Sequence, residues 1–198
     1  MFTEMGKRTY SQGKRAQQAA ETRQRIVEAA AELHEVLGPA NTTISAIAER
    51  AGVQRLTVYR HFPDDRAIFV ACTAHWLTQN PPPDHSEWQD VQEPVQRAVT
   101  ALKRLYAYYT RTQGMLHKTY RDIEVTPALA EPFAGLEAWL DSVRDDLLAQ
   151  WKYRGARRKE LAGVLRHVIS FTTWESLAAN GLSNRQAVET VEKWLRAL

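Results

Sequence analysis

Four consecutive side chains, from Gln54 to Thr57, have the chemistry needed to read the edges of DNA base pairs. Arg55 can donate two hydrogen bonds to guanine, and Gln54 can pair with adenine in a similar way. Leu56 and the methyl group of Thr57 can contact the methyl group of thymine. All four would lie at the exposed start of a short helix. The alternative is a polar helix face that is merely solvated.

A second set of side chains suits the phosphate groups beside such bases. Tyr59, Arg60 and His61 follow on the same short helix. Thr43 and Ser45 lie at the start of the preceding helix, where backbone amides can bind a phosphate. Contacts of this kind would fix the register of the protein on DNA without reading its sequence.

Two short helices joined by a glycine turn must position both sets. Thr43 can cap the first helix, and Gly52 supplies the left-handed conformation that a sharp turn requires. The second helix is expected from about residue 54 to residue 61. Segment 41–62 is therefore predicted to be a helix-turn-helix, whose second helix can enter a major groove about 12 Å wide. Its expected core residues are Ile47, Ala48, Ala51, Val53, Val58 and Phe62.

The rest of the chain has helical periodicity and no persistent strand-like alternation, so the predicted fold class is all-α with about nine helices. An apolar stripe from Ile26 to Leu37 predicts a helix that Gly38 and Pro39 end. A fourth helix should run from about Pro63 to about Thr78. After a proline-rich linker, further helices are expected at about 88–111, 113–122, 127–153, 157–179 and 184–197.

Charge is distributed unevenly along the 198 residues. Residues 1–62 carry nine Lys or Arg and six Asp or Glu, whereas the remainder carries seventeen of each. This N-terminal surplus favours a polyanionic partner. Residues 1–18 lack an apolar face and are predicted to be a flexible basic arm. They should precede a helix-turn-helix domain at 19–66 and a helical domain at 67–198, for which the family resemblance described below implies ligand binding and dimerisation.

Several function classes have no support in the sequence. Cys72 is the only cysteine, which excludes an intrachain disulfide and a zinc site built from cysteines of one chain. The six histidines are scattered, and no catalytic motif occurs, so we expect no metal, no cofactor and no enzyme activity. No stretch reaches the roughly 18 apolar residues of a membrane span, and no signal peptide is evident. The expected location is the cytoplasm.

Three segments resemble the tetracycline-repressor (TetR) family: Arg25–Ala30, Thr43–Val53 and Thr57–Pro63. The resemblance is specific over about residues 22–70. It implies a nine-helix homodimer whose N-terminal helices bind a palindromic operator and whose C-terminal helices bind a small-molecule inducer and form the dimer interface.

The chain departs from the family pattern at two positions. His34 stands where the family usually has an aromatic residue, so this core position would be looser or hydrogen-bonded here. Asp65 stands where the family often has a lysine that contacts phosphate. Either Arg66 takes over that contact or the contact is missing.

The resemblance also suggests where a ligand would bind and how two chains would meet. The stretch 161–177 is apolar nearly all round, and with the last helix it would make a face for a second copy. The predicted homodimer therefore uses the helices at about 157–179 and 184–197. Aromatic residues of the C-terminal helices are candidates for binding a ligand, and the alternative is that they pack in the core or in the dimer interface. The candidate ligand-binding residues are Tyr106, Tyr109, Met115, His117, Tyr120, Arg121, Phe133, Trp139, His167, Phe171 and Trp174.

The expected function is a ligand-responsive transcriptional regulator, a repressor in the usual case, that binds double-stranded operator DNA and an unknown small-molecule effector. A second possibility is DNA binding without any ligand. A third is an all-helical small-molecule carrier or enzyme with no DNA role.

Overall fold

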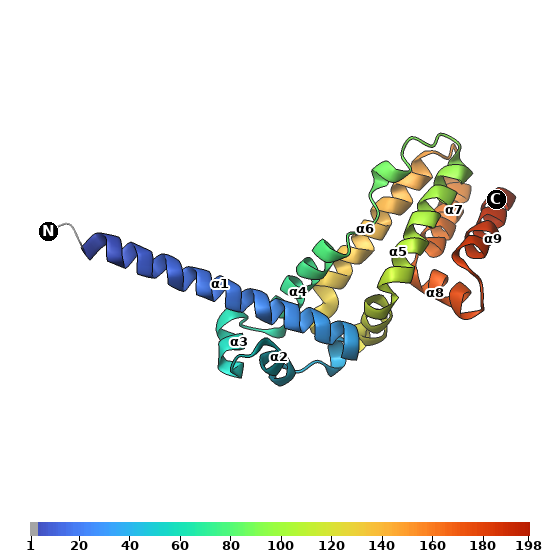
Figure 1. Ribbon diagram of the computed structural model, residues 1–198. Helices are drawn as coiled ribbons and strands as arrows, with labels where there is room; N and C mark the ends of the chain where they lie inside the picture. Colours follow the sequence, from blue (N-terminus) through green and yellow to red (C-terminus); the bar gives the residue numbers. More distant parts are fainter. Residues whose placement is uncertain (1–3) are drawn as a thin grey trace. The chain divides into compact units, whose positions relative to one another are not determined.

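The computed structural model describes the backbone of residues 4–198 and the side chains of residues 13–198. This part of the chain contains helices and no strand (Figure 1), which confirms the all-α prediction. Its nine α-helices are α1 (Glu4–Leu37), α2 (Ile44–Ala51), α3 (Arg55–His61), α4 (Asp65–Gln79), α5 (Pro94–Asp122), α6 (Ala130–Ala149), α7 (Gly155–Val168), α8 (Phe171–Ala179) and α9 (Asn184–Ala197). Short 3-10 turns are η1 (Pro39–Asn41), η2 (His85–Glu87), η3 (Ile123–Val125) and η4 (Pro127–Leu129).

The chain forms two compact units. Unit 1 comprises residues 1–79 and 118–132, and unit 2 comprises residues 80–117 and 133–198. This division differs from the predicted boundary after residue 66. The reason is that α4 packs against α1, while Leu129 of η4 joins the same buried cluster. Unit 1 therefore includes all of α4, the end of α5 and the start of α6.

Helix α1 is longer than the sequence pattern indicates. Helix α1 begins at Glu4, so residues 4–18, which were expected to be a flexible arm, are part of this helix. Residues 1–3 of that predicted arm lie outside the described residues. Lys, Arg, Gln and Ala in this stretch favour a helix, whereas Gly6 and Gly13 disfavour one.

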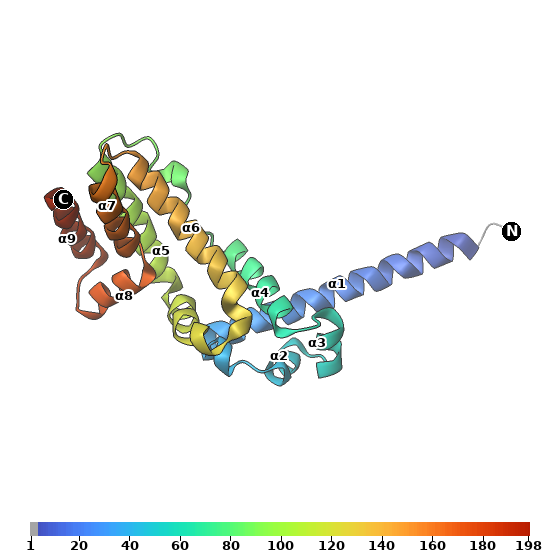
Figure 2. The same cartoon turned by 180° about the vertical axis from the view of Figure 1, so that it is seen from behind.

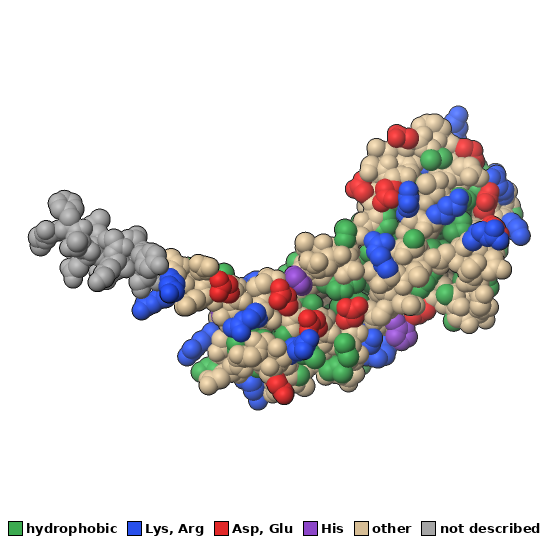
Figure 3. All heavy atoms as spheres, viewed as in Figure 1, with side chains coloured by type: hydrophobic (Ala, Val, Ile, Leu, Met, Phe, Trp, Pro, Cys, Tyr) green, Lys and Arg blue, Asp and Glu red, His purple; other side chains and the backbone are tan. Residues whose placement is uncertain are grey.

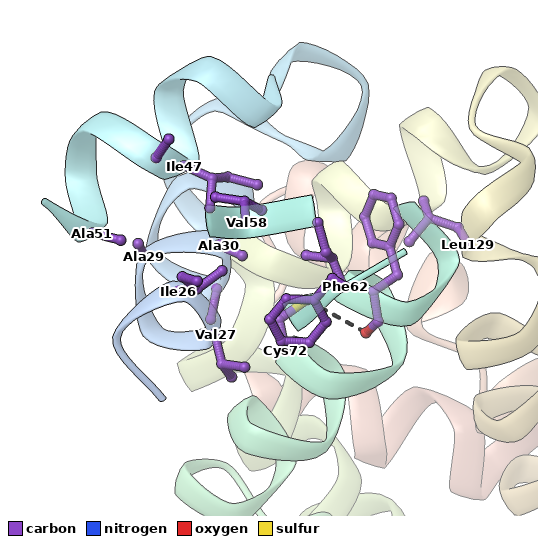
Figure 4. Close-up of a cluster of buried hydrophobic side chains, with 14 residues drawn as sticks. Ile26, Val27, Ala29, Ala30, Ile47, Ala51, Val58, Phe62, Cys72 and Leu129 are labelled. Carbon is purple, nitrogen blue, oxygen red and sulfur yellow. Dashed lines mark hydrogen bonds between the residues drawn. The ribbon is translucent and has the colours of Figure 1, made fainter. Parts of the chain in front are cut away.

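The core of unit 1 lies where α1, α2, α3 and α4 meet. In Figure 4 the side chains of Ile26, Ala30 and Val58 point toward one another. Of the six core residues predicted for the helix-turn-helix, all but Val53 are buried, and Val53 is half-buried.

None of the described helices is long and apolar enough to cross a membrane.

Several helix boundaries in unit 2 differ from those predicted. Residues 88–93 are not helical, and α5 begins at Pro94, a residue suited to the first helical turn. From there α5 continues without a break to Asp122. The expected helix at 157–179 is two helices, because Ser170 adopts an extended conformation (φ −73°, ψ 144°) between α7 and α8.

A buried ion pair organises the core of unit 2. The side chain of Arg97 is 6% exposed, and its Nη2 donates to Asp146 Oδ1 at 2.6 Å. Its Nη1 donates to the carbonyl oxygen of Gln89, and the indole Nε1 of Trp88 donates to Asp146 Oδ2 at 2.9 Å. These bonds offset the cost of burying the two charges. They also explain why Trp88 is a core residue.

Candidate nucleic-acid interface

Helices α2 and α3 form the predicted helix-turn-helix. Thr43 caps α2, since its Oγ1 accepts a hydrogen bond from Ala46 N at 3.1 Å. Gly52 ends α2 in the left-handed region (φ 66°), which lets the chain reverse before α3 begins. Both views of the chain place α2 and α3 against the C-terminal half of α1 (Figures 1 and 2).

The core fixes the orientation of α3. Val58 is fully buried against α1 and α2, and Phe62, just after α3, is 1% exposed. The guanidinium of Arg23 on α1 lies 4.7 Å from the centre of the Phe62 ring. With this side of α3 held by packing, its opposite side is presented to solvent.

The predicted DNA-contacting residues lie on or next to that solvent-facing side. Two are large apolar side chains: Leu56 is 59% exposed and Tyr59 is 43% exposed. The exposed Leu56 side chain at the start of α3 can contact a thymine methyl group. Thr57 and His61 are half-buried, whereas the others are exposed, namely Thr43, Ser45, Gln54, Arg55 and Arg60.

The charge of this surface suits a polyanion. From residue 50 to residue 63 the chain carries three arginines and one histidine and no acidic residue. Arg50 is held by an ion pair to Glu32 on α1 at 2.5 Å, while Arg55 and Arg60 are exposed on α3. Figure 3 shows Lys and Arg side chains on unit 1, with Asp and Glu side chains among them. Clustered cations of this kind gain free energy by releasing the counterions of a phosphate backbone.

Comparison with known proteins bears on the same segment. Residues 26–72 match the family model described as bacterial regulatory proteins, tetR family. A 61-residue segment, 31% of the chain, is 49% identical to the HTH-type transcriptional regulator SrpR of Pseudomonas putida and spans 29% of that relative. This part of the chain is therefore similar to the bacterial regulatory proteins of the tetR family.

Solved structures are similar to this chain in fold over a longer part of its length. A TetR-like transcriptional regulator from Rhodococcus sp. RHA1 aligns over 86% of this chain and 91% of its own, with 14% identity and a TM-score of 0.58. The multidrug binding protein EbrR, complexed with imidazole, aligns over 86% and 88%, with 19% identity and a TM-score of 0.55.

At the first departure from the tetR-family pattern, His34 replaces an aromatic residue and keeps an aromatic contact. Its ring stacks on Phe69, with centroids 4.6 Å apart and planes at 11°. The ring is 4% exposed, and its Nδ1 lies 3.4 Å from Cys72 Sγ. Burial lowers the pKa of His34 to about 4 and raises that of Cys72 to about 12, so both side chains are neutral near pH 7.

At the second departure, Arg66 has a partner within unit 1. Its Nη2 lies 2.5 Å from Glu131 Oε2, and its Nε donates to the same oxygen at 2.6 Å. A phosphate at this position would have to compete with that carboxylate and with the charge of Asp65. We therefore expect the phosphate contact of the family lysine to be weak or missing here.

The structure also reveals an anchor that sequence reasoning missed. Asp122, the last residue of α5, is 3% exposed, and its Oδ2 accepts from the backbone N of Ala40 in η1 at 3.0 Å. Arg121 donates to both carboxylate oxygens, at 2.6 and 2.9 Å, and also to the carbonyl oxygen of Leu37. Gly38 has φ 90°, and a Cβ there would collide with Arg121 and lie 2.6 Å from Asp122 Oδ2.

This anchor holds the segment that leads from α1 into the helix-turn-helix. Arg121, a candidate for ligand binding, lies in unit 1 and takes part in this anchor. A carboxylate at the end of a long helix carries no sequence signal that it will be buried against η1, because the two segments are 82 residues apart.

Four of the candidate ligand-binding residues form an aromatic cluster in unit 2. Tyr109 lies 5.6 Å from Phe171 and 5.9 Å from Trp174, measured between ring centroids, and Tyr106 lies 6.4 Å away. The hydroxyl groups of Tyr106 and Tyr109 donate to the carbonyl oxygens of Val168 and Ile169. Both hydroxyl groups therefore hydrogen-bond to the backbone at the junction of α7 and α8.

The other candidates are less buried. Trp139 lies beside Tyr108, with centroids 6.4 Å apart, and His117 Nδ1 lies 2.7 Å from Glu175 Oε1. His167 is exposed and lies near Thr173 Oγ1. Tyr120 belongs to unit 1, like Arg121. The half-buried candidates of unit 2 are Met115, Phe133 and Trp139.

Proposed function

We propose that this protein is a transcriptional regulator that binds a palindromic DNA operator through α3, with repression as its usual effect. The observation that carries the proposal is the solvent-facing side of α3, where Arg55, Leu56 and Tyr59 are exposed on a helix fixed from behind by Val58 and Phe62. The tetR-family match of residues 26–72 supports the same assignment. Gln54 and Thr57 would complete the base contacts, and Thr43, Ser45, Arg60 and His61 would contact phosphates.

We propose further that the regulator acts as a homodimer through α7, α8 and α9. A two-fold dimer places two recognition helices in successive major grooves, about 34–36 Å apart. The surface of unit 2 supports a second copy here, because Trp194 is 44% exposed on α9. It borders an apolar hollow of about 370 Å³ whose other lining residues are Gly163, Val164, His167, Val168 and Leu198.

A small-molecule effector completes the proposal. EbrR, a structural neighbour, is described as a multidrug binding protein, which supports an effector site in unit 2. If the effector prefers a conformation with α4 displaced, it weakens operator binding by the same factor by which DNA weakens effector binding. Binding to chromosomal DNA would place the protein in the cytoplasm. The candidate residues for the effector remain the eleven aromatic, polar and methionine residues named from the sequence.

Replacing Arg55 with alanine tests the DNA-binding assignment. If Arg55 reads a base, the variant should bind the operator about 1–3 kcal/mol more weakly and lose discrimination at one base pair of each half-site. Fluorescence anisotropy with the operator and with duplexes altered at single positions measures both effects. Arg154→Ala, which removes an exposed arginine from unit 2, is the matched control. Equal behaviour of the two variants would remove Arg55 from the interface.

A further inference from the structure

The first part of α1 extends beyond the core of unit 1. The helix is 34 residues long, but its buried side chains begin at Ile26. Every described side chain from residue 13 to residue 21 is exposed. We call residues 13–25 the α1 extension. It precedes residues 26–72, which match the family model, and only its last residues, such as Arg23 against Phe62, contact the core.

The sign of the charge changes where the α1 extension ends. The extension carries four basic residues against one acidic residue, whereas residues 26–37 carry three glutamates and no Lys or Arg. Figure 3 shows Lys and Arg side chains along this first described part of α1. The basic residues are Lys14, Arg15, Arg23 and Arg25.

One side of the α1 extension is continuous with the helix-turn-helix. At the end of the extension, Arg25 reaches the turn between α2 and α3, where its Nη1 would lie 3.9 Å from a Cβ at Gly52. Gln18 and Lys14 precede Arg25 by seven and eleven residues. At 3.6 residues per turn, all three lie on nearly the same side of the helix, together with Glu21, which follows Lys14 by seven residues. We call this side the Lys14 face.

We infer that the Lys14 face docks on the phosphate backbone of the DNA that flanks each half-site, an inference that rests on the proposed function. Charge complementarity indicates DNA as the partner of this face, because the extension is cationic and is continuous with a surface already suited to DNA. With a rise of about 1.5 Å per residue, Lys14 lies about 16 Å along the helix from Arg25. That length corresponds to about five base pairs of duplex DNA at 3.4 Å each.

The test compares two operator duplexes, one that ends at the palindrome and one with ten further base pairs on each side. Wild-type protein should bind the longer duplex more tightly. Each phosphate contact made by the extension should add about 3-fold to the loss of affinity between 50 and 200 mM salt. The variant with Lys14→Ala and Arg15→Ala should lose both the preference for the longer duplex and this part of the salt dependence.

Two control variants isolate the position of the charges. Lys103→Ala with Lys152→Ala removes two exposed cations from unit 2, and Gln24→Ala changes an exposed neutral residue of the extension that is not on the Lys14 face. Both should behave as wild type on the two duplexes. Circular dichroism at 222 nm checks that the helix content of each variant is unchanged.

The outcomes separate this inference from the proposed function. If wild-type protein selects no duplex, the proposed function fails. If it binds an operator and the Lys14 and Arg15 variant keeps the wild-type preference and salt dependence, the inference alone fails. It also fails if the variant keeps full DNA binding and instead loses binding to vesicles of phosphatidylglycerol, since the face would then contact a lipid surface.

Discussion

Replacing Asp122 with alanine is expected to lower the free energy of unfolding of unit 1 by about 2–3 kcal/mol. The variant loses a charged acceptor that is 3% exposed and leaves the backbone N–H of Ala40 without its partner. The Arg121 guanidinium is 44% exposed, so water can solvate it once the carboxylate is gone. For this reason the expected cost is below that of stranding a fully buried charge.

Hydrogen exchange combined with urea unfolding measures this effect. Amides of the C-terminal half of α1 and of η1 should exchange faster in the Asp122→Ala variant, because the segment they form loses its tie to α5. Asp122→Asn keeps an oxygen that can accept from Ala40 and should be intermediate. Protection equal to wild type in both variants would show that the anchor does not stabilise this segment.

Acidification is expected to destabilise unit 1 through His34. The pKa of His34 is about 4 in the folded protein, below its ordinary value of 6.5, because burial disfavours the charged ring. The unfolded chain therefore binds more protons between these values, and stability rises with pH there. The contribution of the neutral ring is fully present above pH 6.5 and is lost as the pH falls toward 4. The total loss is about 3 kcal/mol.

The variant His34→Phe should remove this part of the pH dependence. Phenylalanine preserves stacking on Phe69 but cannot titrate. Urea unfolding of both proteins between pH 7 and pH 4 measures the difference in slope. Ile68→Val, a mild change in the same buried cluster, is the control: it should lower stability at every pH and keep the wild-type slope. A wild-type slope in His34→Phe would contradict the account.

The parts of this protein that could be predicted from its sequence are those set by local chemistry. Thr43 and Gly52 specify a cap and a left-handed turn within a few residues of the helices they bound. The spacing of Ile47, Ala51 and Val58 indicates one buried side. These local signals were sufficient for the helix-turn-helix and for the all-α fold class.

The parts that could not be predicted depend on segments distant in the sequence. Arg66 meets Glu131, and Asp122 meets Ala40, only after the chain has folded. The junction at Ser170 has the same cause: the apolar pattern of 161–177 continues through it, while Tyr106 and Tyr109 of α5 hold its backbone carbonyls. Apolar periodicity reports which residues are buried and not where a buried helix is interrupted.

The central claim is tested most directly by selecting the sequences that the protein binds from random duplex DNA. The affinity of the protein for the most enriched sequence is then measured at two salt concentrations. The account predicts a palindromic consensus with half-sites about one helical turn apart and affinity that falls steeply with salt. No enrichment, or enrichment of unrelated sequences, would contradict DNA binding by α3. It would favour a small-molecule carrier or enzyme, with the aromatic cluster of unit 2 as the region to study.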